Sequence, residues 1–139
     1  MADLIVHLDY DLEPLERHGA WIDLPCSKDI WLREGDTEII PLGVQIKMPD
    51  GYEGLIAPRS STFLRYGVIQ ANSIGIIEND YCGPNDDWGM VVWATRDVHI
   101  PRGTRIAQFR LLKSMDDISI EYVDAMPFPN RGGYGSTGR

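Results

Sequence analysis

Apolar residues at every second position recur along this chain in short runs, and this pattern limits the fold more than any other feature. In the run 42–48, LGVQIKM, every second residue is apolar. Successive side chains of a β-strand point to opposite faces, so the alternation places the apolar residues on one face. The same pattern returns at 4–8, 90–94 and 118–122. We therefore expect strands that each bury one face.

Turn-forming residues separate these runs. Glycine and proline together number 23, from 14 and 9, and are scattered along the chain as many short strands require. Asp50-Gly51 is a hairpin signal, and Pro101 to Gly103 marks another turn. No segment keeps a helical period, and the best helix candidate is 60–66, with Ser60 or Ser61 as N-cap. The sequence predicts one all-β domain, a barrel or sandwich, with one short helix.

The length and net charge of the chain limit the classes of function that it can have. The chain has 139 residues, enough for one domain with its own core, and its net charge is −8. An acidic balance argues against a nucleic-acid binder, but a few focused Arg residues can still hold a small anion. The sequence lacks an apolar run long enough for a membrane span and opens without a signal-peptide pattern, so we expect a cytoplasmic protein. Cys26, Cys82 and the three histidines form no ligand pattern, so no structural metal is expected.

Two short segments carry residues suited to binding a nucleotide. Pro58-Arg59-Ser60-Ser61 stands where a strand runs into the short helix, a natural anion site, although an ordinary capped helix explains it equally well. In 67–83, GVIQANSIGIIENDYCG, a tight hairpin is expected to carry Asn72, Glu78 and Tyr81. An amide can read a base edge, a carboxylate can activate water and a ring can pack on a sugar. Solvated turn residues are the alternative.

The C-terminal segment differs in composition. From Pro127 the chain reads PFPNRGGYGSTGR, which predicts a flexible arm at 127–139 after a core domain at 1–126. A disordered tail is the simpler reading. A role in binding is the other reading, because glycines are interspersed with Arg131, Tyr134, Ser136 and Thr137. Glycine lets the backbone approach phosphate oxygens closely.

Five motifs in one order resemble the trimeric dUTP diphosphatases (dUTPases) over nearly the whole chain. They are AWIDL at 20–24, PRSSTFLRYG at 58–67, NSIGIIENDYCG at 72–83, RIAQF at 105–109 and RGGYGSTG at 131–138. The resemblance implies a jelly-roll-like subunit, a homotrimer with sites built from more than one subunit, and cleavage of dUTP to dUMP and pyrophosphate. It also implies Mg²⁺ held by the triphosphate and waters rather than directly by protein ligands.

The resemblance assigns each motif residue a role. Glu78 would be the general base, with Asp23 near the sugar and the waters around Mg²⁺, and Ser60 beside the leaving oxygen. The resemblance also implies phosphate contacts from Arg59, Ser60, Ser61 and Gln108. Uracil would be read by Asn72 and the backbone from Gly75 to Ile77, and deoxyribose would pack against Tyr81. In the arm, γ-phosphate would be bound by Arg131, Ser136 and Thr137, while Tyr134 would stack on the uracil face.

The sequence departs from the family pattern at the residue expected to be the general base. Glu78 stands where the family has Asp, one methylene further out, and Asp80 is a candidate to assist it. About three residues are inserted in 84–89, and Arg131 lies closer to Tyr134 than usual. Two alternatives follow: a dUTP-binding regulatory protein with weakened catalysis, acting through a protein partner, and a dCTP deaminase-like enzyme on the same fold.

Overall fold

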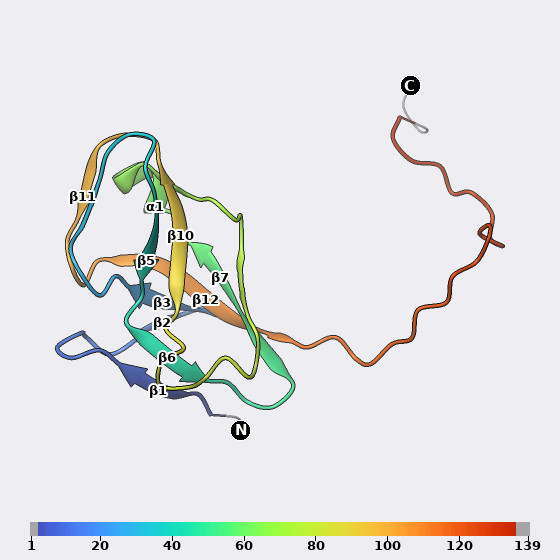
Figure 1. The fold of residues 1–139 in the computed structure, drawn as a ribbon, viewed down its shortest axis with the longest axis horizontal. Coiled ribbons are helices and arrows are strands. Elements are labelled where there is room, and N and C mark those ends of the chain that lie inside the picture. The colour runs from blue at the N-terminus through green and yellow to red at the C-terminus, as the bar shows by residue number, and fades with distance from the viewer. Residues whose placement is uncertain (1–2, 136–139) are drawn as a thin grey trace.

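The structure is a computed structural model that describes residues 3–135. Within that range the chain forms short β-strands and one five-residue helix (Figure 1). The elements are β1 (Ile5–Leu8), β2 (Arg17–His18), β3 (Trp21–Pro25), β4 (Ile30–Leu32), β5 (Thr37–Pro41), β6 (Val44–Lys47), β7 (Tyr52–Pro58), α1 (Thr62–Tyr66), β8 (Val68–Gln70), β9 (Gly75–Ile77), β10 (Gly89–Ala94), β11 (Val98–Ile100) and β12 (Arg105–Lys113). This confirms the prediction of an all-β domain with one short helix.

The strands form four antiparallel sheets around one interior. A five-stranded sheet has the order β2-β3-β12-β7-β9, and a three-stranded sheet has the order β5-β10-β8. Two further pairs, β1-β6 and β4-β11, complete the body. Figure 1 shows α1 and β11 at one end of this body and β1 and β6 at the other.

The predicted alternation decides which side chains are buried. In β6 and just after it, Val44, Ile46 and Met48 are buried, while the intervening Gln45 and Lys47 are partly exposed. The alternate apolar residues of β10 are also fully buried. The Asp50-Gly51 hairpin is wrong, however: the turn exists, but β6 pairs with β1 and β7 pairs with β12 and β9. A turn signal fixes a change of direction and does not fix which strands pair.

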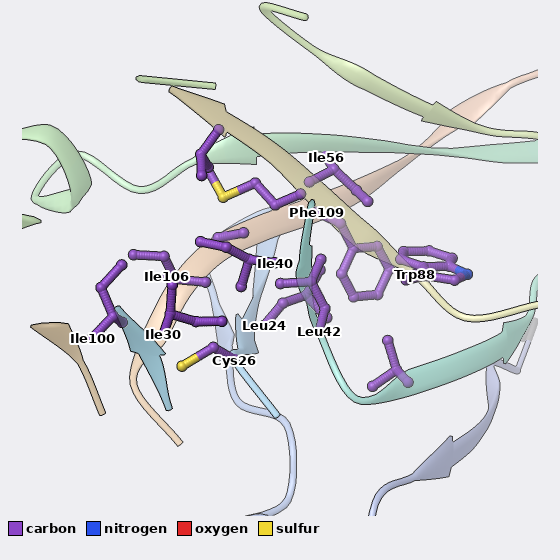
Figure 2. Close-up of a cluster of buried hydrophobic side chains, with 14 of the residues drawn as sticks. Leu24, Cys26, Ile30, Ile40, Leu42, Ile56, Trp88, Ile100, Ile106 and Phe109 are labelled. Atoms are coloured by element: carbon purple, nitrogen blue, oxygen red, sulfur yellow. The ribbon is translucent and has the colours of Figure 1, made fainter. Parts of the chain in front are cut away.

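One core joins residues from both larger sheets (Figure 2). At one end the Trp88 ring meets the Phe109 ring edge to face, with centroids 5.1 Å apart. Gly54 faces Trp88, and a Cβ there would lie 3.0 Å from the Trp88 ring, so a larger residue would require the ring to shift by a few tenths of an ångström. Cys26 is also buried, which raises the pKa of its thiol, and both cysteines are free.

The chain leaves the body where β12 ends, at Lys113 (Figure 1). The strand predicted at 118–122 is wrong: Ile118 and Ile120 are 66% and 72% exposed and lie outside any strand. An alternating segment needs a sheet edge to pair with, and this segment lies away from the edges of its own body. The division between core and arm at residues 126 and 127 stays a prediction.

Candidate active site

A buried carboxylate lies on the outer face of the five-stranded sheet. Asp23 on β3 is the cross-strand partner of Gln108 on β12, so the two side chains share a face. Asp23 is only 4% exposed. The Gln108 amide donates a hydrogen bond from Nε2 to the Pro58 carbonyl oxygen at 3.0 Å, which fixes it beside the end of β7. Two residues that are uninformative alone are therefore neighbours.

Three basic side chains surround the Asp23 carboxylate. Arg59 Nε lies 3.3 Å from Oδ1, while His18 Nε2 and Arg105 Nη1 lie 3.4 and 3.8 Å from Oδ2. Arg105 also donates to Glu16 Oε2 at 2.6 Å, and this hydrogen bond lowers the pKa of Glu16. Asp23 Oδ2 is buried without a hydrogen-bond partner among the described residues. Its hydrogen-bonding capacity is therefore not used by the described residues, and the atom has almost no solvent-accessible surface.

The segment between β7 and α1 holds Arg59 in place. Arg59 Nη1 donates to the Arg105 carbonyl oxygen at 3.0 Å, and its backbone N–H donates to Thr62 Oγ1 at 2.9 Å. The Thr62 hydroxyl in turn donates to the Ile106 carbonyl oxygen. Ser61 occupies the N-cap position, as predicted, but makes no side-chain capping bond. Thr62 ties this segment together, while Ser60 is exposed beside Arg59.

The predicted hairpin around Asn72 is wrong in its pairing. β8 lies in the three-stranded sheet and β9 at the edge of the five-stranded sheet, so the turn between them joins two sheets. The Ile74 N–H donates to the Asn72 carbonyl oxygen at 2.7 Å, and Ser73 has a φ of +63°. Asn72 is exposed at this turn, and Gly75 opens β9.

Glu78 and Tyr81 line one open, mainly apolar pocket of about 550 Å³. That volume falls within the range of small-molecule sites. The other lining residues are Ile39, Pro41, Ile76, Ile77, Asp80, Asp87, Trp88 and Gly89. The Tyr81 hydroxyl donates to the Asp87 carbonyl oxygen at 3.0 Å, so the loop at 84–89 holds the ring in place. The structure thus brings the predicted base and sugar-binding ring together.

The residues around Asp23 (the Asp23 cluster) and the pocket lined by Glu78 and Tyr81 lie at opposite ends of β7. Glu78 follows Ile77, whose Cα partner is Gly54 near the start of β7. Arg59 and Ser60 follow Pro58, where β7 ends. In the same antiparallel register Glu78 lies level with Glu53, six residues before Arg59. A strand rises ~3.3 Å per residue, so roughly 20 Å of strand separates the levels of Glu78 and Arg59. One copy of the chain does not bring the carboxylate and the phosphate-binding residues to the same place.

The arm residues lie apart from both clusters. Arg131 and Tyr134 are exposed on the segment that extends away from the body (Figure 1). Gly132 and Gly135 have φ of +92° and +76°, a backbone region that favours glycine. Ser136 and Thr137 lie outside the described residues.

Sequence reasoning missed three residues of the Asp23 cluster. Glu16 and His18 are exposed polar residues outside the motifs, and only the pairing of β2 with β3 brings them to Asp23. Thr62 stands within a motif, but no sequence pattern distinguishes its bridging hydroxyl from the two serines before it.

Comparison with known proteins identifies relatives along almost the full chain. A sequence model of the dUTPase family matches residues 11–138. The SPbeta prophage-derived deoxyuridine 5′-triphosphate nucleotidohydrolase YosS of Bacillus subtilis is 44% identical over 120 residues, covering 86% of this chain and 84% of that protein. The deoxyuridine 5′-triphosphate nucleotidohydrolase of Cutibacterium acnes is 33% identical over 144 residues, covering 99% and 94%.

Solved structures share the fold. The Staphylococcus bacteriophage 80alpha dUTPase with dUPNHPP superimposes with a TM-score of 0.82 at 19% identity, covering 99% of each chain. The dUTPase from Streptococcus mutans gives a TM-score of 0.72 at 23% identity, covering 82% of this chain and 98% of that one. The predicted jelly-roll-like fold is confirmed. The chain therefore belongs to the dUTPase family.

Proposed function

We propose that this dUTPase hydrolyses dUTP to dUMP and pyrophosphate by using Glu78 to deprotonate a water that attacks the α-phosphate. The observation that carries the proposal is the shared pocket of Glu78 and Tyr81, which has room for a nucleoside. The carboxylate is exposed at the pocket wall, where a water can reach it. Asp80 lines the same pocket and is the nearest candidate to assist.

The β9 edge is suited to reading uracil. Among residues 3–135, β9 is the last strand of its sheet and pairs only with β7, so no described strand uses the backbone groups on the other side of Gly75 to Ile77. These groups and the exposed Asn72 amide offer donors and acceptors that match a uracil edge. Cytosine would reverse one of these matches and leave groups unpaired. Tyr81, fixed by its bond to Asp87, would pack against deoxyribose and leave no room for a 2′-hydroxyl.

The Asp23 cluster is suited to the triphosphate and its Mg²⁺. Arg59, Ser60, Ser61 and Gln108 would bind phosphate oxygens, with Ser60 beside the oxygen that leaves. Asp23 Oδ2, which accepts no hydrogen bond from the described residues, would accept one from a water in the shell of Mg²⁺, an ion that retains water readily. Residues 3–135 contain no group of three or more His, Cys, Asp or Glu arranged to hold a metal. When bound, Mg²⁺ supplies positive charge that neutralises the phosphates.

We further propose that each site is shared between copies in a homotrimer. The attacked phosphorus and the leaving oxygen are bonded to each other, so Glu78 and Ser60 must serve one substrate from opposite ends of β7. The three-stranded sheet also has an apolar outer face: Ile39, Ile69 and Trp93 are 63%, 43% and 41% exposed. Burying this face between copies would remove it from water. Ile39 also lines the Glu78 pocket, so the face is continuous with the site.

The arm completes the proposal. Arg131, Ser136 and Thr137 would clasp the γ-phosphate while Tyr134 stacks on uracil, excluding bulk water. The described residues contain no helix long and apolar enough to cross a membrane. A cytoplasmic enzyme of the nucleotide pool, with no nucleic-acid or membrane partner, is part of the same proposal.

A side-by-side assay tests the proposed function. Pyrophosphate release from dUTP, dCTP, dTTP and UTP with Mg²⁺ should be fast for dUTP alone. Binding of dUTP without pyrophosphate release would favour the regulatory alternative, and in that case Glu78→Asp should restore turnover by orders of magnitude. Release of ammonia from dCTP would instead identify a deaminase and overturn the proposal.

A further inference from the structure

Asn79, between Glu78 and Asp80, is fixed by three polar contacts. Its Nδ2 donates to the Pro49 carbonyl oxygen at 2.8 Å and to the Tyr52 carbonyl oxygen at 2.7 Å. Lys47 Nζ donates to its Oδ1 at 3.4 Å. Carbonyl oxygens only accept and an ammonium only donates, so these partners allow one orientation of the amide. The side chain ties its own segment to the turn between β6 and β7.

This anchor sits inside the turn that carries both site residues of the pocket. The Tyr81 N–H donates to the Glu78 carbonyl oxygen at 3.1 Å, closing a four-residue turn with Asn79 in its second position. Glu78, Asp80 and Tyr81 line the pocket, whereas Asn79 does not line it and bonds instead to the turn between β6 and β7. A rotation of the turn would move the carboxylate and the ring together.

We propose that Asn79 is the positioning residue that fixes where the Glu78 carboxylate lies at the wall of the pocket. The inference rests on the proposed role of Glu78 as base. A Glu carboxylate stands on one more rotatable bond than an Asp carboxylate and can reach more positions, so a fixed backbone turn is needed to limit where it lies. The two carbonyl contacts fix that start, and Lys47 holds the amide in the orientation that makes both. Asn79 itself touches no substrate.

Asn79→Ala removes all three contacts and leaves the pocket lining unchanged. Because displacements of ~1 Å at a reacting centre can cost ~10²-fold in rate, we expect kcat for dUTP to fall by about 10- to 100-fold. KM should change less than about threefold, since the uracil groups proposed at β9 do not depend on this side chain. Asn85→Ala, on the exposed inserted loop, is the matched control and should keep kcat. If Asn79→Ala misfolds, Asn79→Ser gives the same comparison.

A double-mutant cycle separates positioning from general loss of structure. With Glu78→Asp, whose carboxylate is already displaced, adding Asn79→Ala should reduce kcat much less than it does beside Glu78. An equal loss in both backgrounds, or an unchanged kcat in Asn79→Ala, would overturn the inference. Glu78→Gln tests the proposed function separately. If that variant stays fully active, Glu78 is not the base and the proposed function is wrong, whatever the result for Asn79.

Discussion

Asp23 and Arg59 form an ion pair at 3.3 Å, although Asp23 lies on β3 and Arg59 lies in the segment that follows β7. The carboxylate is buried and the guanidinium is partly exposed, so the pair presents one open cationic face beside Ser60. Arg59 is held from behind by the Arg105 carbonyl oxygen. Asp23 therefore orients Arg59 through Oδ1, while its Oδ2 faces His18 and Arg105.

Asp23→Asn tests this arrangement. Loss of the charge leaves Arg59, Arg105 and His18 without their shared partner, so we expect kcat/KM for dUTP to fall at least tenfold. Removing the charge of one partner from a buried ion-pair cluster is strongly destabilising, so the melting temperature should also fall. Thermal unfolding and steady-state kinetics measure the two effects. Asp116→Asn, on the exposed segment after β12, is the control, and an equal effect there would contradict the assignment.

Glu78→Gln keeps the size of the side chain and removes its basicity. General base catalysis contributes about 10²- to 10⁴-fold, so kcat should fall by that factor while dUTP binding persists. Single-turnover pyrophosphate release and equilibrium binding of a non-hydrolysable dUTP analogue separate the two quantities. Glu34→Gln, on an exposed turn, should leave both unchanged. A variant that binds poorly but turns over normally would assign Glu78 to binding instead.

Tyr81→Ala removes the ring expected to exclude the 2′-hydroxyl. We expect the ratio of kcat/KM for dUTP to that for UTP to fall at least tenfold, mainly because UTP becomes a better substrate. Competition assays with both nucleotides measure the ratio. Tyr10→Ala, at a 90% exposed position, is the control. An unchanged ratio would mean that another group rejects the ribose.

Asp29 should make stability depend on pH. The Arg102 N–H and His99 hydrogen-bond its carboxylate, which lowers the pKa of Asp29 in the folded protein. The folded state therefore binds this proton less readily than the unfolded chain, whose Asp pKa is ~3.9. Its stabilisation is present above that pH and is lost as pH falls through the folded pKa.

Asp29→Asn should accordingly have a lower melting temperature than the unchanged protein at pH 7. The difference between the two melting temperatures should disappear in strong acid. Thermal unfolding of both proteins across this range checks the sign. A deficit that grows as the pH falls would contradict it.

The sequence predicted the class of fold because apolar alternation reports directly on burial, as Ile46 and Met90 illustrate. It did not predict which strands pair. Asp50-Gly51 and the turn after Gln70 each reverse the chain, yet each connects strands of different sheets. Pairing depends on the packing of the whole core, which local turn chemistry does not encode. The alternation at 118–122 failed for a related reason, since a strand also requires a partner edge.

The site was predictable as a set of residues more than as a geometry. The motifs identified Glu78 and Tyr81, which share a pocket, and Asp23 and Gln108, which are cross-strand partners. They did not reveal that these groups lie at opposite ends of β7. Nor did they reveal Asn79, whose amide bonds to the Pro49 and Tyr52 carbonyl oxygens exist only in the folded chain.

Mixing two inactive variants tests the shared site most directly. Glu78→Gln lacks the base and Arg59→Ala lacks the phosphate-binding cation, so each should be nearly inactive alone. If every site takes these residues from different copies, trimers re-formed from an equal mixture should recover activity at about one quarter of their sites. If Glu78 and Arg59 of the same copy act together, the mixture should remain as inactive as its components, and the account would be wrong.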